Sequence, residues 1–137
     1  MRSYTAKKNT KHLTQNEIFE QQMVRHYFLF CANCGLRSGE IRQLKWHNVS
    51  TYKDITKRKV EGIFANVLVE KMTSKVRKAR RVFSRGGEHI ERWKQLCKEN
   101  NKELEGYVFS IDGKEYSRSN LHRHWQKIMK LADIDED

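Results

Sequence analysis

The sequence of 137 residues contains no proline and no long apolar run. Composition alone offers no physical reason for the absence of proline. The longest apolar run, at residues 27–32, is too short to cross a membrane, since a spanning helix needs about 20 apolar residues. The N-terminus is polar and basic and lacks an apolar core, unlike a secretory signal. We therefore expect no association with a membrane and no secretion.

Cysteine is scarce, with three residues in the chain. Cys31 and Cys34 form one C-x-x-C, but no second such pair exists to complete a zinc site. Cys97 and the six histidines show no ligand spacing either. We expect buried, reduced thiols, as in a cytosolic protein, and no metal or other cofactor. Linkers, repeats and low-complexity segments are also missing, so the length predicts one domain with one core.

Positive charge is abundant, with 28 lysines and arginines against 17 acidic residues and a net charge of +11. Residues 71–85 hold seven of the basic side chains and no acidic one. Clustering of this kind favours a polyanion partner over an evenly solvated basic surface. The last five residues, by contrast, include four acidic ones.

A sharp joint between two helices is predicted near residue 37. A capping box at 14–17 opens an apolar helix, and Gly35 can take the left-handed conformation that ends it. Ser38 is expected to cap a second, short helix, which places Arg37 between the two. The planar guanidinium suits a phosphate, and Glu40, one turn further, can orient it. The alternative is that Arg37 is a surface residue of the joint without a functional role.

A basic β-hairpin is expected after this joint. Residues 50–62 read as a polar loop, 63–69 as a strand, 71–79 as a cationic turn and 80–84 as the returning strand. An amphipathic helix at 88–99 follows Gly86 and Gly87. The next segment predicts a small hairpin over 108–116 and a third strand from 107–110.

A last helix is predicted after Ser117 or Ser119, either of which can cap it. Four apolar residues are expected to face the core: Leu121, Trp125, Ile128 and Leu131. Three basic residues share the opposite face and are expected to contact a DNA backbone: Arg123, Lys127 and Lys130. His122 and His124 read as polar helix residues or further backbone contacts.

The motif Gly35-Leu36-Arg37-x-x-Glu40-Ile41 follows an apolar helix and precedes the Leu-x-Trp at 44–46. It resembles the first arginine motif of the tyrosine recombinases, or phage integrases. The order of the later elements resembles that family too, from about Leu13 to Ile134. The resemblance implies an α+β fold: a mainly helical DNA breaking-rejoining catalytic domain with a small antiparallel sheet around the basic hairpin. Residues 1–12 would be a basic lead-in and 13–137 a partial catalytic domain. His89 and Arg92 match the family's second motif in letters only, and we interpret them as a coincidence.

In this family a tyrosine attacks the scissile phosphate, two arginines stabilise the developing charge, and a hairpin lysine protonates the leaving oxygen. The resemblance implies that Arg37 is the first arginine, Glu40 its support and Lys75 the acid. Lys71 and Lys78 remain alternatives to Lys75. Five residues of the basic hairpin are expected to contact DNA phosphates: Lys71, Arg77, Lys78, Arg80 and Arg81.

The family's His-x-Leu-Arg-His motif and its nucleophile come after the helix that ends near residue 134. The tyrosines of this chain all lie in the wrong part of that order. We expect the chain alone to bind double-stranded DNA as an inactive monomer. In a complete recombinase it would act with other protomers in DNA integration or excision, in the host cytoplasm or nucleoid. A non-catalytic DNA-binding regulator or remnant is the main alternative, and an RNA-binding or scaffold domain is a third.

Overall fold

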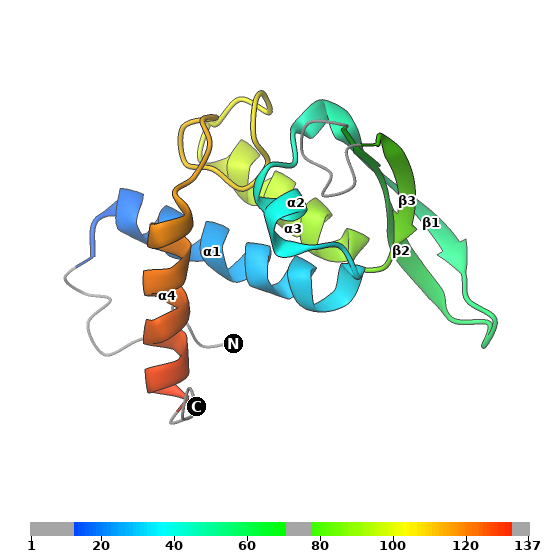
Figure 1. Cartoon of the computed structure of the whole chain (residues 1–137), viewed down its shortest axis with the longest axis horizontal. Helices are drawn as coiled ribbons and strands as arrows, with labels where there is room; N and C mark the ends of the chain where they lie inside the picture. Colours follow the sequence, from blue (N-terminus) through cyan, green and yellow to red (C-terminus); the bar gives the residue numbers. More distant parts are fainter. Residues whose placement is uncertain (1–12, 71–77, 133–137) are drawn as a thin grey trace.

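A computed structural model describes residues 13–70 and 78–132, to which every structural statement below refers (Figure 1). Four α-helices and a small three-stranded antiparallel sheet make the fold α+β, as predicted. The helices are α1 (Gln15–Cys34), α2 (Ser38–Arg42), α3 (Gly87–Glu99) and α4 (Arg118–Leu131), with a short 3-10 turn η2 (Trp46–Asn48). The strands are β1 (Val49–Ile55), β2 (Glu61–Val69) and β3 (Arg80–Ser84). Within the described ranges, no helix is both long and apolar enough to span a membrane.

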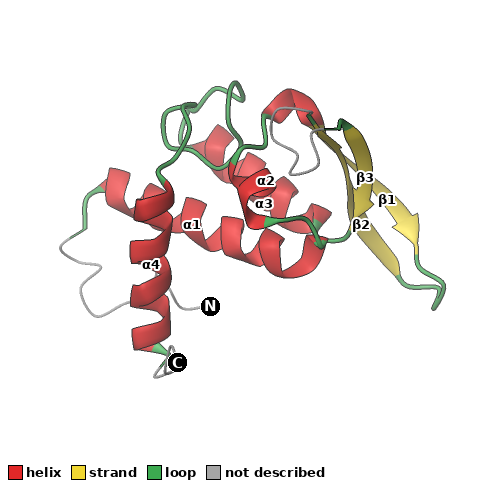
Figure 2. Cartoon of the chain, in the orientation of Figure 1, coloured by secondary structure: helices red, strands yellow, loops and turns green. Residues whose placement is uncertain are grey.

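The long helix α1 runs through the middle of the molecule (Figure 2). Its predicted capping box is confirmed, because the hydroxyl of Thr14 accepts a hydrogen bond of 3.1 Å from the backbone N–H of Glu17. Gly35 ends the helix with a φ of +75°, in the left-handed region. The ring of Phe19 lies 4.9 Å from Trp93 of α3, and the Trp93 indole donates to the Val108 carbonyl at 2.7 Å. These contacts tie α1, α3 and the following loop into one core.

The sheet has the order β1-β2-β3, with Val67 paired to Val49 on one side and Val82 on the other. The predicted strands at 63–69 and 80–84 are confirmed. The predicted loop over 50–62 is wrong, because most of it forms β1 and the turn into β2. Since β1 is an edge strand with mostly exposed side chains, its sequence is polar and hides the alternation that marks a half-buried strand.

The segment around residue 108 is not a strand, so the third strand expected from 107–110 is wrong. That strand is β1. A single bridge joins Tyr107 to Lys45, with Val108 N–H donating to the Leu44 carbonyl at 2.9 Å. The small hairpin expected over 108–116 is also wrong. This segment is a compact loop, in which the Ser110 hydroxyl donates to the Lys114 carbonyl at 2.5 Å. Side-chain bonds to the loop backbone replace the strand pairing.

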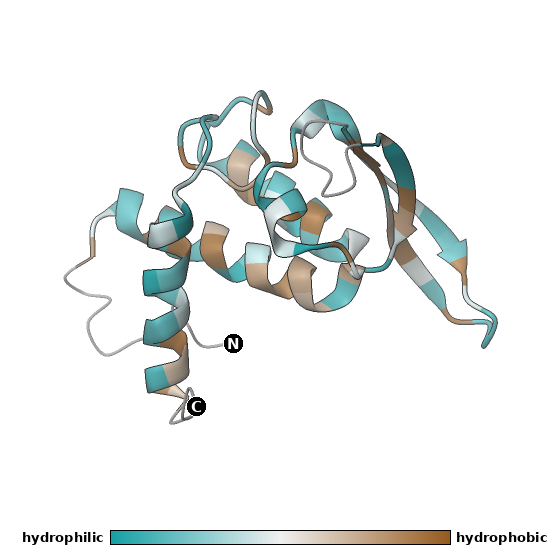
Figure 3. Cartoon of the chain, viewed as in Figure 1, coloured by the Kyte–Doolittle hydropathy of each residue, from teal (hydrophilic) through white to brown (hydrophobic). Residues whose placement is uncertain are grey.

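Helix α4 lies across α1 at the end of the molecule opposite the sheet (Figure 1). Ser117 caps it, accepting from the backbone N–H of Asn120 at 3.3 Å. Two of its four predicted core residues are wrong: Trp125 is 39% exposed and Leu131 is 57% exposed. Leu121, His124 and Ile128 form the buried stripe instead. The helix buries this narrow stripe, and its colours alternate between brown and teal (Figure 3).

Candidate nucleic-acid interface

The arginine joint forms where α1 ends and α2 begins. After Gly35 the backbone is extended at Arg37, with φ −71° and ψ 143°, which makes Arg37 the N-cap residue of α2. The prediction that Ser38 caps this helix is wrong, because Ser38 is already its first helical residue. The backbone N–H of Arg37 donates to Glu40 Oε1 at 3.2 Å. The side chain of Arg37 is 52% exposed, on a backbone that this hydrogen bond holds in place.

Glu40 is the centre of the site. Its carboxylate is only 3% exposed and accepts two hydrogen bonds from Arg80, at 2.7 Å from Nη1 to Oε2 and 2.8 Å from Nη2 to Oε1. Parallel bonds of this kind are the strong form of an arginine–carboxylate pair. The hydrogen bonds from Arg80 hold the pKa of Glu40 below its usual range, so the carboxylate is ionised at neutral pH.

Arg37 is the more distant partner of this carboxylate. Its Nη1 lies 3.9 Å from Glu40 Oε2, beyond hydrogen-bonding distance. Glu40 thus supports Arg37 mainly through the backbone N–H, while its charge is matched by Arg80. The charge of Arg37 is therefore available for an anion. Chemically, the joint can offer a guanidinium to a phosphate oxygen, because the one nearby carboxylate described, Glu40, already accepts two hydrogen bonds from Arg80.

Arg80 has a contact within the protein that the sequence did not suggest. Its guanidinium bonds to Glu40 and so ties the start of β3 to α2, while the DNA phosphate contact predicted for Arg80 stays a prediction. Its neighbour Arg81 is exposed and donates to Asn66 Oδ1 at 2.8 Å, on the next strand. Lys78 is exposed before β3. Three predicted residues of the hairpin fall outside the described residues: Lys71, Lys75 and Arg77.

The basic face of α4 is exposed and is not part of this joint. Arg123, Lys127 and Lys130 all face solvent, and α4 stands at the end of the molecule away from the sheet (Figure 1). The structure therefore brings Arg37, Glu40 and Arg80 together and leaves the α4 residues as a separate basic surface.

The sequence did not predict a hollow of about 330 Å³ that lies beside the joint and is lined by two arginines. Arg42 and Arg118 line it, together with Phe28 and Trp125, whose rings lie 5.1 Å apart. Arg42 is anchored there by Glu115 at 2.5 Å and by the Tyr116 carbonyl at 3.2 Å. No sequence signal could reveal this hollow, because its two arginines come from helices far apart in the chain.

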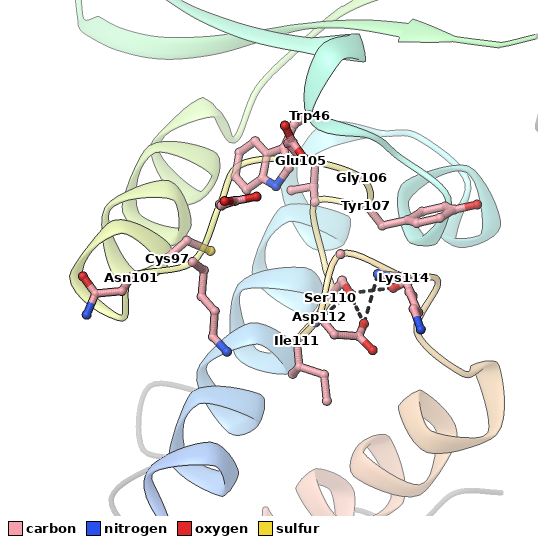
Figure 4. A pocket seen from close by; sticks show the side chains of 14 residues that line it. Trp46, Cys97, Asn101, Glu105, Gly106, Tyr107, Ser110, Ile111, Asp112 and Lys114 are labelled. Atoms are coloured by element: carbon pink, nitrogen blue, oxygen red, sulfur yellow. Dashed lines mark hydrogen bonds between the residues drawn. The ribbon is translucent and has the colours of Figure 1, made fainter.

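A larger hollow of about 530 Å³ lies between the end of α3 and the loop over 101–114 (Figure 4). Its polar groups bond to one another: Asp112 accepts from the Lys114 N–H at 3.0 Å, and its own backbone N–H donates to the Ser110 hydroxyl at 3.3 Å. Burial raises the pKa of the lining Cys97 thiol to about 12, so this thiol is not a nucleophile at neutral pH. The hydrogen bonds give this loop its shape and bring no reactive group together.

No group of three or more ligating side chains suited to a metal ion occurs in ranges 13–70 and 78–132. No family model, curated protein or solved structure matches this chain. A function can therefore be proposed only from the residues and the geometry.

Proposed function

We propose that this chain is the DNA-binding part of a site-specific tyrosine recombinase, which acts in DNA integration or excision. The observation that carries this proposal is the half-exposed guanidinium of Arg37, fixed at a helix joint beside a carboxylate that Arg80 already neutralises. An unpaired Glu40 carboxylate would bind Arg37 itself and repel a phosphate. With Arg80 in place, the field at Arg37 favours an anion.

In the complete recombinase, Arg37 would stabilise the charge that develops on the scissile phosphate, an electrostatic contribution. Glu40 would position Arg37, and Lys75 would protonate the leaving oxygen. Lys71 and Lys78 stay open as alternatives to Lys75.

The nucleophile of such a reaction is not assigned to this chain. The Tyr27 hydroxyl is buried and donates to the Ser38 carbonyl at 3.1 Å, and burial raises its pKa. Tyr116 is also buried and donates to Glu20 at 3.0 Å. Such hydroxyls are poorly placed to attack DNA. The chain alone would therefore bind duplex DNA as a monomer without cutting it, and cleavage would need further protein segments and other protomers, in the cytoplasm or nucleoid.

The test is duplex-DNA binding by fluorescence anisotropy at several salt concentrations. The logarithm of the association constant should fall linearly with the logarithm of salt concentration, because phosphate contacts release counterions. Arg37→Ala should reduce that slope by about one and weaken binding only modestly, since one phosphate contact is lost. A wild-type affinity independent of salt would contradict DNA binding.

Arg92→Ala is the matched control, because Arg92 is an exposed arginine on α3 outside the joint. It should leave the salt slope close to that of the wild type. Equal slopes for Arg37→Ala and Arg92→Ala would show that Arg37 makes no special phosphate contact.

A non-catalytic DNA-binding regulator is the second candidate, and the engaged hydroxyls of Tyr27 and Tyr116 favour it. Both candidates bind duplex DNA, so binding does not separate them. Reading the gene beyond the codon for Asp137 does. A frame that continues into His-x-x-Arg-His and a tyrosine supports the recombinase, whereas a stop codon supports the regulator. A covalent DNA adduct that survives detergent with this chain alone would contradict both.

A further inference from the structure

One face of the sheet is turned away from all four helices (Figure 2). Along β2, Ala65, Val67 and Val69 are buried against the core, at 0%, 1% and 3% exposure. Since successive side chains of a strand point to opposite faces, Phe64 and Asn66 lie on the outer face. Register places the strand neighbours of these two residues on the same face.

Three aromatic rings gather on this outer face, one from each strand. Tyr52 of β1 is paired with Phe64, and the two rings stack at 5.7 Å with 24° between their planes. Phe83 of β3 lies edge-on to Tyr52, at 6.3 Å and 78°. Phe83 is 64% exposed, although it belongs to a regular strand. The core does not use this ring, and exposed apolar clusters on a folded domain mark binding surfaces.

A guanidinium stands beside the rings. Arg81 is paired with Leu68 on this outer face and donates to Asn66, the residue paired with Phe83. An arginine has several N–H donors, so one bond to Asn66 leaves others for a phosphate. The one acid that the register places on this face is Asp54, whose Oδ1 accepts the backbone N–H of Ile55 at 2.7 Å.

We propose that this outer sheet face, Tyr52, Phe64, Phe83 and Arg81, binds single-stranded nucleic acid. An unpaired base stacks on the exposed ring of Phe83, and a neighbouring phosphate pairs with Arg81. In a duplex each base face is covered by its neighbours, so only an unstacked base can lie on a ring. This face therefore serves a different ligand from the duplex phosphate proposed for Arg37.

Charge selects nucleic acid over a protein partner. The chain carries a net charge of +11, and three consecutive basic residues, Lys57, Arg58 and Lys59, lie in the turn at the end of the β1–β2 hairpin. A basic side chain beside the rings, Arg81, provides backbone attraction together with stacking, as surfaces for single strands require. A second copy of this chain would bring the same positive charge to the face.

The experiment measures binding of a fluorescent oligothymidine of about twelve nucleotides by anisotropy at fixed salt, a length within the range that such surfaces cover. Phe83→Ala should weaken this binding about fivefold or more, because loss of one stacked base has at least that effect. Phe83→Trp, which keeps an aromatic ring at this position, should bind the oligothymidine about as tightly as the wild type. Arg81→Ala should reduce the salt slope by about one.

Leu131→Ala is the matched control, since Leu131 is also an exposed apolar residue, at 57%, but stands on α4. It should leave single-strand affinity unchanged. Unchanged affinity in Phe83→Ala would overturn the proposal. So would concentration-dependent self-association of the wild type that Phe83→Ala abolishes in sedimentation, because the face would then bind a second copy.

The two proposals fail separately. Phe83→Ala should leave duplex binding and its salt slope unchanged, while Arg37→Ala should leave the stacking effect of Phe83 unchanged. If Phe83→Ala weakens duplex and single-strand binding equally, the ring does not select unpaired bases and the inference about this face is wrong, whatever the result at Arg37.

Discussion

The carboxylate of Glu40 and the guanidinium of Arg80 form a pair of hydrogen bonds, 2.7 and 2.8 Å long, between residues 40 positions apart. This pair joins the short helix α2 to the start of β3. It also compensates the charge of the Glu40 side chain, which is only 3% exposed. The pair therefore determines both how the joint packs and how much positive charge Arg37 presents.

Arg80→Ala should lower the free energy of unfolding by about 1–3 kcal/mol. Removing one partner of a buried ion pair leaves an uncompensated charge, which costs about 3–5 kcal/mol when both groups are fully buried. Arg80 is 34% exposed, so water compensates part of that loss. Urea denaturation followed by circular dichroism measures the change.

Arg81→Ala is the control for this prediction, because it removes a neighbouring guanidinium that is exposed and bonds to the exposed side of the sheet, at Asn66. It should change stability by no more than about 0.5 kcal/mol. The double variant Glu40→Gln with Arg80→Met should be more stable than Arg80→Ala alone, since the buried charge is gone. If Arg80→Ala and Arg81→Ala lower the free energy of unfolding equally, the Glu40–Arg80 pair contributes little to stability.

The end of α1 at Gly35 could be predicted from the sequence, whereas the ion pair between Glu40 and Arg80 could not. Gly35 and the capping box at 14–17 act within a few residues, so their patterns are visible in the chain. The sequence also suggests that Glu40 serves Arg37, three residues away. The closer partner, Arg80, becomes its neighbour only through the register of a sheet, which no local pattern encodes.

Two other wrong predictions, at β1 and at α4, also have their origin in tertiary packing. The strand β1 could not be recognised in the sequence, because an edge strand keeps polar side chains, such as Lys53 and Asp54, in water. On α4 the apolar spacing suggested Trp125 and Leu131 as core residues. The helix instead turns His124 inward, where its Nε2 lies 3.4 Å from Glu20 Oε1. A polar pair between two helices outweighed the hydrophobic pattern of one.

Gly87→Ala should destabilise the protein by about 1–3 kcal/mol, the usual effect of overpacking. The first turn of α3 packs directly on β2, and a Cβ at Gly87 would lie 2.6 Å from the backbone carbonyl carbon and oxygen of Phe64. Backbone atoms of a paired strand cannot move aside cheaply. Thermal or urea unfolding of the variant tests the expectation.

Gly39→Ala provides the contrast, because a Cβ at Gly39 meets nothing within 4 Å and its φ is not positive. Gly39 lies in α2, so alanine should be neutral or stabilising by up to about 1 kcal/mol. If both variants lose similar stability, the close approach of α3 to β2 is not the cause.

Acid should destabilise the protein already below about pH 6.5, the ordinary pKa of histidine. Burial, the largest cause, lowers the pKa of both His26 and His89, and the nearby cations Arg25 and Arg92 lower it further. The unfolded chain therefore binds more protons than the folded one as pH falls, so the stability present above pH 6.5 is lost below it.

The slope of unfolding free energy against pH, measured between about pH 7.5 and 5.5, tests this linkage. His89→Gln should make the slope shallower, because one buried titrating group is removed. His122→Gln should not, because His122 is exposed on α4. Glu40 does not contribute in this range, since its lowered pKa places its effect at more acidic pH. A wild-type slope of zero would contradict the linkage.

The thiols should resist alkylation until the protein unfolds. Burial raises the pKa of Cys31 and of Cys97 to about 12, and it raises that of Cys34 as well. Because the thiolate is the reactive form, iodoacetamide at neutral pH should label none of them quickly in the native protein. Mass spectrometry across a urea series should show labelling that rises with the unfolded fraction. Cys31 should react first, because it is the one half-buried thiol of the three. Fast native labelling of Cys97 would instead show that the end of α3 opens without global unfolding.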